Sequence, residues 1–404
     1  MVKSINKFRL LVFPLIFAAG LTAGWFINDH PIRIHQATYQ KNSPQAFYSE
    51  AYDKIKENYW EKITDEQLIE MFKTASTALN KPINAKIESK NALLKELNKA
   101  DSVKLVSQVL VNLKPQGRSG IFTTKQEEQL KNTVSNVNPD KDLYKDLGLA
   151  KGASKAAVEE AYQKLPPEKK NLEQIAYAKD VLTKKETKQR YDGGGIEPTI
   201  FTKVIGSTLY LQFTKFSPTS LEEFQQAFEA QKEEELDSLI LDLRGNIGGA
   251  IDATAYFLGF FLGKNQLAFE FYKKGEYLPF RTPTDKIPTI SQYRQIVVLI
   301  DNQTQSSAEM MAAAFKRYHL GMVLGVPTKG WGTVERVFPL DNQFDPKEKY
   351  SMFLVHSITL RDDNQPIEGR GVEPDISIKD PNWESQVFSY FRNQSLIEAV
   401  KSTI

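Results

Sequence analysis

Ser306 stands where a buried strand is expected to give way to a helix. The stretch 301–310 reads Asp-Asn-Gln-Thr-Gln-Ser-Ser-Ala-Glu-Met, and an apolar helix is predicted over 310–318. A serine at a helix N-terminus has free backbone N–H groups beside it, which stabilise an alkoxide or a tetrahedral oxyanion. Ser306 with Glu309 also fits the spacing of a capping box, which needs no catalysis. The sequence therefore predicts either a nucleophile or a helix cap.

A second stretch, 241–249, carries a glycine turn at the end of a short apolar run. It reads Leu-Asp-Leu-Arg-Gly-Asn-Ile-Gly-Gly, and a helix is predicted over 251–262. Glycines at such a junction let backbone N–H groups face a developing negative charge, as an oxyanion hole requires. Gly-Gly after a strand also serves simply to turn the chain, and that interpretation stays open for Gly248 and Gly249.

Two later stretches complete a pattern that resembles the carboxyl-terminal processing, or tail-specific, serine peptidases. That family carries Asp-Leu-Arg-x-Asn-x-Gly-Gly, Ser-x-x-Glu, Gly-x-x-Thr-x-Gly-Lys-Gly-x-Val-Gln and a closing Gly-x-Gly-x-Glu-Pro-Asp. This chain has the first motif at 242–249, the second at 306–309, an altered third at 325–335 and the last at 369–375. The resemblance implies an α/β peptidase core of layered sheet and helices that acts on protein or peptide tails.

The resemblance also assigns roles to single residues. Ser306 takes the place of the nucleophile, and Glu309 closes the Ser-x-x-Glu motif at the start of the helix. The backbone N–H of Ser307, together with that of Gly248 or Gly249, would form the oxyanion hole.

The position of the general base departs from the family. There, a lysine that is neutral in a dry pocket removes the serine proton. Here that position holds Trp331, whose indole N–H only donates hydrogen bonds, and Glu335 replaces the supporting glutamine. Three residues are candidate replacements for the base: Lys329, on the same face of an extended segment, Glu335 acting through a water, and His356, on a strand predicted over 352–360.

Two functions follow from these residues. The first is a serine peptidase that cuts C-terminal or unfolded segments of extracytoplasmic proteins through Ser306 with a displaced base. The second is a pseudopeptidase of the same fold that binds such segments as a scaffold or adaptor without cleaving them. A general base contributes about 10² to 10⁴ in rate, so its uncompensated loss would leave little turnover.

Residues 1–30 predict a membrane anchor. Lys3, Lys7 and Arg9 precede an uncharged run over 10–27, whose length is at the lower end of what spans a bilayer. Positive charges before the span put that end in the cytoplasm and the rest of the chain in the periplasm or the extracellular space. The alternative is cleavage as a signal peptide, which would release a secreted protein.

Residues 142–192 resemble the J-domain of DnaJ-type cochaperones. In that family a His-Pro-Asp loop stimulates the Hsp70 ATPase, whereas this chain has Pro-Pro-Glu-Lys at 166–169. We therefore expect a degenerate helical insert with a packing or docking role, and no Hsp70 partner. The insert occupies the slot in which the peptidase family carries a substrate-binding PDZ domain. The matching residues are Tyr144, Leu147, Gly148, Ala161, Tyr162, Ala176, Tyr177, Val181, Leu182, Arg190, Tyr191 and Asp192.

The remaining pattern divides the chain into segments. Apolar residues at helical intervals predict an all-α N-terminal module, with 118–130 as a loop entering a helix. Thr64 with Gln67, and Ser220 with Glu223, have capping-box spacing. The predicted segments are an anchor at 1–30, a helical module at 31–135, the J-like insert at 140–193, a peptidase-like α/β domain at 197–380 and a C-terminal helix at 381–404.

Composition excludes several classes of partner and cofactor. Lys and Arg number 52 against 50 Asp and Glu, a net charge of +2 that is too balanced for a nucleic-acid-binding protein. The absence of cysteine removes disulfides, thiol nucleophiles and thiolate metal sites. The four histidines form no HExxH pair, and no glycine run fits a dinucleotide or Walker pattern. We expect no metal and no cofactor, and as partners only substrate tails and the membrane.

Overall fold

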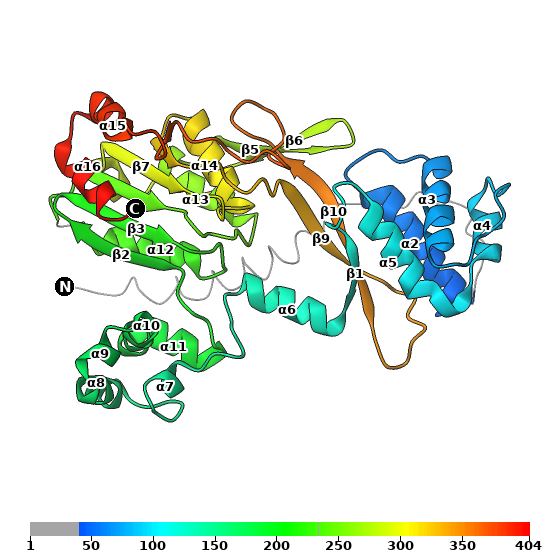
Figure 1. Cartoon of the computed structure of the whole chain (residues 1–404), viewed down its shortest axis with the longest axis horizontal. Coiled ribbons are helices and arrows are strands. Elements are labelled where there is room, and N and C mark those ends of the chain that lie inside the picture. Colours follow the sequence, from blue (N-terminus) through cyan, green and yellow to red (C-terminus); the bar gives the residue numbers. More distant parts are fainter. Residues whose placement is uncertain (1–39, 233) are drawn as a thin grey trace, which may run out of the picture. The chain divides into compact units, whose positions relative to one another are not determined.

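The computed structural model describes residues 40–232 and 234–404 (Figure 1). The predicted membrane segment, 10–27, lies outside these ranges. Within them no helix is long and apolar enough to cross a bilayer.

The N-terminal region is helical, as predicted, and contains near its end a short strand, β1, that the sequence did not predict. The Thr64–Gln67 capping box is confirmed, because the Gln67 side chain accepts the Thr64 N–H at 2.8 Å and Thr64 Oγ1 accepts the Gln67 N–H at 3.2 Å. The strand forms because Phe122 stacks on Phe353 of a distant strand, a tertiary contact without a local signal. The elements are α2 (Pro44–Asn58), α3 (Asp65–Ala78), α4 (Lys90–Glu96), η1 (Lys99–Asp101), α5 (Ser102–Asn112), β1 (Gly120–Thr123) and α6 (Thr124–Val134).

The insert folds into short helices around a hydrophobic cluster of its own. Tyr144, Leu147, Val181, Leu182 and Tyr191, on which part of the J-domain resemblance rests, all belong to this cluster. The helix that ends the insert stops at Gly195 in the left-handed conformation. The helices are α7 (Leu143–Asp146), α8 (Lys155–Lys164), α9 (Pro167–Lys170), α10 (Glu173–Thr183) and α11 (Lys185–Gly194).

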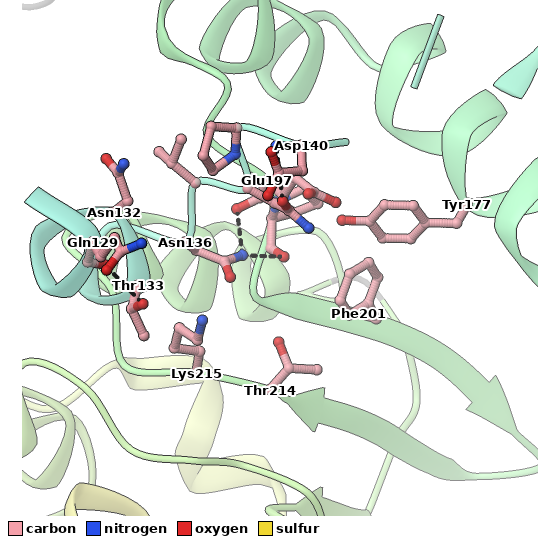
Figure 2. A pocket seen from close by; sticks show the side chains of 14 residues that line it. Gln129, Asn132, Thr133, Asn136, Asp140, Tyr177, Glu197, Phe201, Thr214 and Lys215 are labelled. Atoms are coloured by element: carbon pink, nitrogen blue, oxygen red, sulfur yellow. Dashed lines mark hydrogen bonds between the residues drawn. The ribbon is translucent and has the colours of Figure 1, made fainter. Parts of the chain in front are cut away.

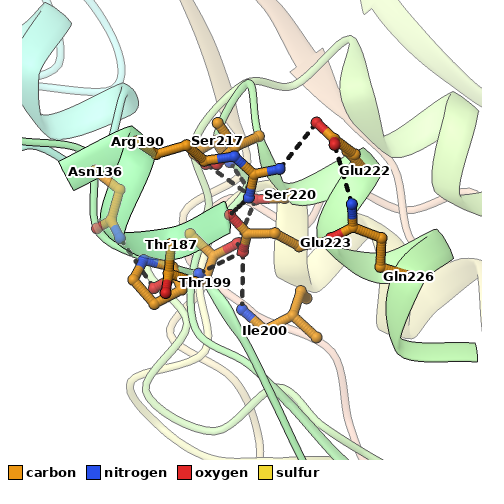
Figure 3. Close-up of polar contacts among 12 residues, drawn as sticks. Asn136, Thr187, Arg190, Thr199, Ile200, Ser217, Ser220, Glu222, Glu223 and Gln226 are labelled. Atoms are coloured by element: carbon orange, nitrogen blue, oxygen red, sulfur yellow. Dashed lines mark hydrogen bonds and ion pairs between the residues drawn. The ribbon is translucent and has the colours of Figure 1, made fainter. Parts of the chain in front are cut away.

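Polar contacts hold the base of the insert against the α/β region (Figure 3). Arg190 of α11 pairs with Glu222 at 2.9 Å and with Glu223 at 3.1 Å, both on α12 (Ser220–Glu229). The buried Glu223 carboxylate also accepts the N–H of Thr199 at 2.7 Å. The capping box predicted for Ser220 and Glu223 is therefore wrong. Thr219 is the N-cap residue, and the Glu223 carboxylate instead accepts a hydrogen bond from Thr199, in the segment before β2.

A six-stranded sheet forms the centre of the α/β region. Its strand order is β11-β8-β7-β4-β3-β2, and all neighbours are parallel except the β2–β3 hairpin. Because β4 and β7 are parallel neighbours, the segments that follow them, 243–249 and 301–306, begin at the same edge of the sheet. The strands are β2 (Ile200–Ile205), β3 (Thr208–Phe213), β4 (Ser238–Asp242), β7 (Gln295–Ile300), β8 (Met322–Gly325) and β11 (Ile376–Ser377).

Helices bury this sheet. Ile240, Val297 and Leu299 pack against two C-terminal helices, α15 (Trp383–Phe391) and α16 (Gln394–Lys401). The sequence predicted a single helix there, but Arg392 adopts a left-handed conformation and Asn393 caps a new helix. Helix α13 (Ala253–Leu262) follows the segment 243–249, and helix α14 (Ser307–Arg317) follows the segment 301–306. A 3₁₀ turn, η2 (Pro288–Gln292), precedes β7.

A second, antiparallel sheet joins the N-terminal region to the α/β region. Its order is β1-β10-β5-β6, with β9 also paired to β10. Sequence patterns predicted β10 but not this sheet as a unit, because paired residues such as Gly120 and Phe353 lie more than two hundred positions apart. The strands besides β1 are β5 (Leu267–Lys273), β6 (Glu276–Arg281), β9 (Thr333–Pro339) and β10 (Tyr350–Thr359).

Candidate active site

Asn246 fixes the turn after β4. It is fully buried, and its Nδ2 donates to the carbonyl of Phe213 at 2.7 Å while its Oδ1 accepts the Gly248 N–H at 2.8 Å. Its carbonyl accepts the N–H of Gln305 at 2.9 Å. One side chain and its backbone thus tie together a sheet strand, the glycine turn and the loop that carries Ser306.

The two glycines of the turn lie against the serine segment and the segment that follows strand β3. A Cβ atom on Gly248 would lie 2.7 Å from the Cβ of Ser306, and one on Gly249 would lie 2.1 Å from the carbonyl oxygen of Phe216. Gly248 has φ +81° and Gly249 has φ +140°, which also favour glycine. Glycine is therefore required at 248 because the backbone lies so close to Ser306, and not only because the chain turns there.

Ser306 has a strained backbone. Ser306 forms the predicted capping box with Glu309, but its φ of 57° and ψ of −124° differ from the extended conformation of an ordinary N-cap residue. Such conformations cost on the order of 1–3 kcal/mol and cluster at functional sites. The backbone N–H of Ser306 donates to Glu309 Oε2 at 2.8 Å. Glu309 thus helps to hold the strained residue in place.

Two backbone donors beside Ser306 are unpaired in the described part of the chain. Asn246 occupies the Gly248 N–H, which leaves the N–H groups of Gly249 and Ser307 without an acceptor. Ser307 Oγ donates to the carbonyl of Gly249 at 3.4 Å, so these two residues are in contact. Of the two oxyanion pairs that the sequence left open, this arrangement favours Gly249 with Ser307.

Glu309 connects the serine segment to the altered base segment. Its buried carboxylate accepts hydrogen bonds from Thr328 Oγ1 at 2.5 Å and from the Gly330 N–H at 2.7 Å through Oε1, and from the Trp331 N–H at 2.8 Å through Oε2. Burial raises the pKa of the Glu309 carboxyl, and these hydrogen bonds oppose part of the rise. Glu309 Oε2 thus accepts hydrogen bonds from the backbone N–H groups of both Ser306 and Trp331.

The Trp331 side chain is held by charged neighbours. The Arg118 guanidinium lies 3.3 Å from the centre of its ring, and the indole Nε1 donates to Glu335 Oε1 at 3.1 Å. Arg118 also pairs with Glu368 at 3.1 Å, and Glu368 Oε2 accepts the N–H of Gly332 at 2.8 Å. The N-terminal region thus contributes a cation to the position where the family carries its base.

The three candidate bases lie in different surroundings. Lys329 is exposed, its N–H donates to the carbonyl of Thr304 at 3.0 Å, and its Nζ lies 5.9 Å from the centre of the Trp331 ring. Glu335 also accepts a hydrogen bond from Thr333 Oγ1 at 2.5 Å, and burial raises the pKa of its carboxyl. Of the three, only Lys329 has its backbone bonded to the serine loop.

His356 belongs to the second sheet. Its Nε2 is 2.7 Å from Lys273 Nζ and its Nδ1 is 2.8 Å from Ser357 Oγ. Burial, with help from the Arg336 and lysine cations, lowers the pKa of His356 to about 3. Both ring nitrogens are thus engaged with partners other than Ser306.

Sequence reasoning missed Arg118, Glu368 and the separate role of Asn246. Arg118 lies 250 positions from its partner Glu368, and no local pattern predicts such a contact. Asn246 did have a signal, since it is part of the glycine-turn motif. Among the described residues, no group of three acidic or histidine side chains could hold a metal ion.

A glycine turn and a strained serine thus lie at adjacent ends of parallel strands in an α/β fold, and a helix starts directly after the serine. The amino-acid sequence supports a narrower assignment. Residues 207–378 match the model of peptidase family S41, and this part of the chain resembles the carboxy-terminal processing proteases.

Individual relatives agree with this assignment. The carboxy-terminal processing proteases CtpA and CtpB of Bacillus subtilis are 28% and 27% identical over 175 and 186 residues, which is 43% and 45% of this chain. The chain spans about a third of their length, 35% and 36%. The solved structure of the photosystem II D1 C-terminal processing protease superposes with a TM-score of 0.51 at 14% identity, over 83% of this chain and 93% of that one. This last match shows a shared fold.

Proposed function

We propose that this chain is a serine peptidase of the carboxy-terminal processing kind, which cuts C-terminal or unfolded segments of proteins outside the cytoplasm. The strained backbone of Ser306, in contact with Gly248, is the observation that carries the proposal. A helix cap needs neither feature. The cationic and apolar sequence of residues 1–30 supports a membrane-anchored location, with the soluble part extracytoplasmic.

The proposed reaction begins when the Ser306 hydroxyl attacks a peptide carbonyl. The carbonyl oxygen then carries a negative charge, to which the N–H groups of Gly249 and Ser307 donate. The amine of Lys329 takes the serine proton and passes it to the leaving amine, and water then hydrolyses the acyl ester. The bond between Lys329 N–H and the carbonyl of Thr304 supports this role, because it ties Lys329 to the serine loop. Its exposed amine must turn inward and lose water when a substrate covers the site.

Cleavage of an unfolded protein tests the proposal. The full chain is incubated with a permanently unfolded reporter protein, and the fragments are identified by mass spectrometry. We expect cleavage by the wild type, none by Ser306→Ala, and at least a tenfold slower rate for Lys329→Ala. Lys347→Ala, which changes an exposed lysine in another loop, should match the wild type. Absence of cleavage by the wild type would refute peptidase activity on this reporter.

A second function, peptide binding without cleavage, is favoured by the surroundings of Trp331. Its indole cannot take a proton, and Arg118 stacked on the ring disfavours any other cation there. On this alternative, wild type and Ser306→Ala bind the unfolded reporter with equal affinity and both leave it intact. The fragments detected in the cleavage experiment distinguish the two functions.

The insert, in this proposal, packs against the peptidase domain as a structural or docking element. The ion pairs of Arg190 with α12 and the separate hydrophobic cluster support that role. Because the connection at 166–169 has no histidine, we expect the chain to leave the ATPase rate of an Hsp70 unchanged. A steady-state ATPase assay with and without the full chain checks this expectation.

A further inference from the structure

A cavity of about 640 Å³ lies where the insert joins the peptidase domain (Figure 2). Helix α6 lines it with Gln129 and Asn132, helix α10 of the insert with Tyr177, and the peptidase domain with Phe201 and Lys215. This volume is in the range of ordinary ligand pockets. None of the residues described for the Ser306 site lines it.

The walls of the cavity are held in place by the crossing of the two chain segments that enter and leave the insert. Asn136 Nδ2 donates to the carbonyl of Glu197 at 2.9 Å, and the Glu197 N–H donates to the carbonyl of Asn136 at 3.1 Å. Lys141 pairs with the buried Glu197 carboxylate at 2.8 Å. The cavity therefore has a built frame.

Lys215 supplies a cation that no acid of the described residues pairs within 4 Å. Its amine ends inside the cavity, and no dashed line reaches it in Figure 2. Partial burial lowers the pKa of Lys215, and the nearby Glu197 opposes the shift. Since Lys141 already neutralises Glu197, the amine lacks a carboxylate of its own.

The other residues that line the cavity indicate which groups a ligand would carry beside an anionic group bound by Lys215. The side chains of Gln129 and Asn132 make no hydrogen bond within the described chain, so they are available to a ligand with amide groups. Phe201 and Tyr177, with ring centres 5.9 Å apart, form an aromatic wall. The exposed Asp140 also borders the cavity and disfavours a ligand with two or more negative charges.

We propose that this cavity binds the free C-terminus of a peptide, with the terminal carboxylate on Lys215, the adjacent amide groups on Gln129 and Asn132, and an apolar last side chain against Phe201 and Tyr177. One carboxylate, amides and an apolar group match the one cation, the amide side chains and the aromatic wall. A phosphate group carries too much charge for a cavity that Asp140 also borders.

The cavity and the Ser306 site share one segment of chain. Lys215 precedes Phe216, whose N–H donates to the carbonyl of Gly248 at 2.9 Å and whose carbonyl accepts the Ala250 N–H at 2.8 Å. A tail held by Lys215 is thus attached to the segment that supports the glycine turn. That the tail belongs to a substrate rests on the proposed function; the binding itself does not.

Fluorescence anisotropy with the full-length Ser306→Ala variant tests this proposal without cleavage. The probe is a labelled unfolded decapeptide ending in leucine, with either a free or an amidated C-terminus. Loss of a charge-assisted hydrogen bond should weaken binding roughly 10- to 100-fold for the amidated probe and for Lys215→Met. Lys215→Arg should restore most of the affinity, and Asn132→Leu, on the surface of α6, should weaken it several-fold.

Lys203→Met is the matched control, because Lys203 of β2 lies over Tyr210, outside the cavity. It should bind the free-acid probe like the parent. Equal affinity for the two probes, equal effects of Lys215→Met and Lys203→Met, or no binding of the free-acid probe would overturn the proposal. N-acetyl-leucine as competitor separates the sources of the carboxylate: displacement only at much higher concentration than an unlabelled peptide supports a tail, and equal potency contradicts it. Cleavage of the unfolded reporter by the wild type is measured separately. It shows whether the peptidase proposal holds when the tail-binding proposal fails.

Discussion

Gly248→Ala tests whether the glycine turn is built around Ser306. The new Cβ would lie 2.7 Å from Ser306 Cβ and 3.0 Å from both the Gln305 carbonyl oxygen and the Ser307 nitrogen. At φ +81° an alanine also pays a backbone strain of about 1 kcal/mol. Overpacking of a rigid site adds about 1–3 kcal/mol. We therefore expect the free energy of unfolding to fall by about 3 kcal/mol, with displacement of Ser306.

Gly245 offers a matched control in the same turn. It has φ +70°, but a Cβ there meets nothing within 4 Å. Gly245→Ala therefore bears the backbone strain alone, about 1 kcal/mol. The difference between the two variants, about 2 kcal/mol, isolates the contact with Ser306.

Urea denaturation combined with hydrogen–deuterium exchange measures both effects. Exchange in the segments 240–262 and 298–316 reports local opening around the turn and around Ser306. We expect Gly248→Ala to accelerate exchange in both segments and Gly245→Ala to leave 298–316 nearly unchanged. Equal destabilisation by the two substitutions, with equal exchange near Ser306, would refute the contact.

Three further predictions concern residues around the site. His356, whose pKa is about 3 in the folded chain and about 6.5 when unfolded, stays neutral below pH 6.5 while the unfolded chain binds a proton, so stability falls as pH drops from 6.5 toward 3. His356→Gln should remove that part of the pH dependence of urea denaturation, and His319→Gln, at an exposed position, should not. Asn246→Ala leaves two buried partners unpaired and should lower the free energy of unfolding by about 2–4 kcal/mol in the same assay. Arg118→Ala should increase acrylamide quenching of Trp331, measured as the difference from the same variant with Trp331→Phe; unchanged quenching would contradict the stacking.

Local patterns predicted the elements that carry the candidate site. The short apolar run before the glycine turn and the buried strand expected before Ser306 correspond to the neighbouring strands β4 and β7, and the helices after Gly249 and Ser306 begin close to the predicted positions. These succeed because a buried parallel strand and a following helix leave signals within about ten residues.

What sequence reasoning could not supply depends on distant contacts. The antiparallel sheet pairs β1 with β10, and Arg118 reaches Trp331 across more than two hundred residues. The bonds of Glu223 to Thr199 and Arg190 override a capping-box spacing that is locally valid. The strained conformation of Ser306 likewise follows from its contacts with Gly248 and Glu309, which no local propensity encodes.

Site-resolved labelling of Ser306 with a fluorophosphonate tests most directly whether this S41-like region has a nucleophilic serine. Mass spectrometry locates the adduct in the wild type, in Ser306→Ala and in Trp331→Lys, which restores the family's base position. We predict an adduct on Ser306 in the wild type, faster labelling in Trp331→Lys and no adduct in Ser306→Ala. An unlabelled Ser306 in both the wild type and Trp331→Lys would contradict a nucleophilic Ser306.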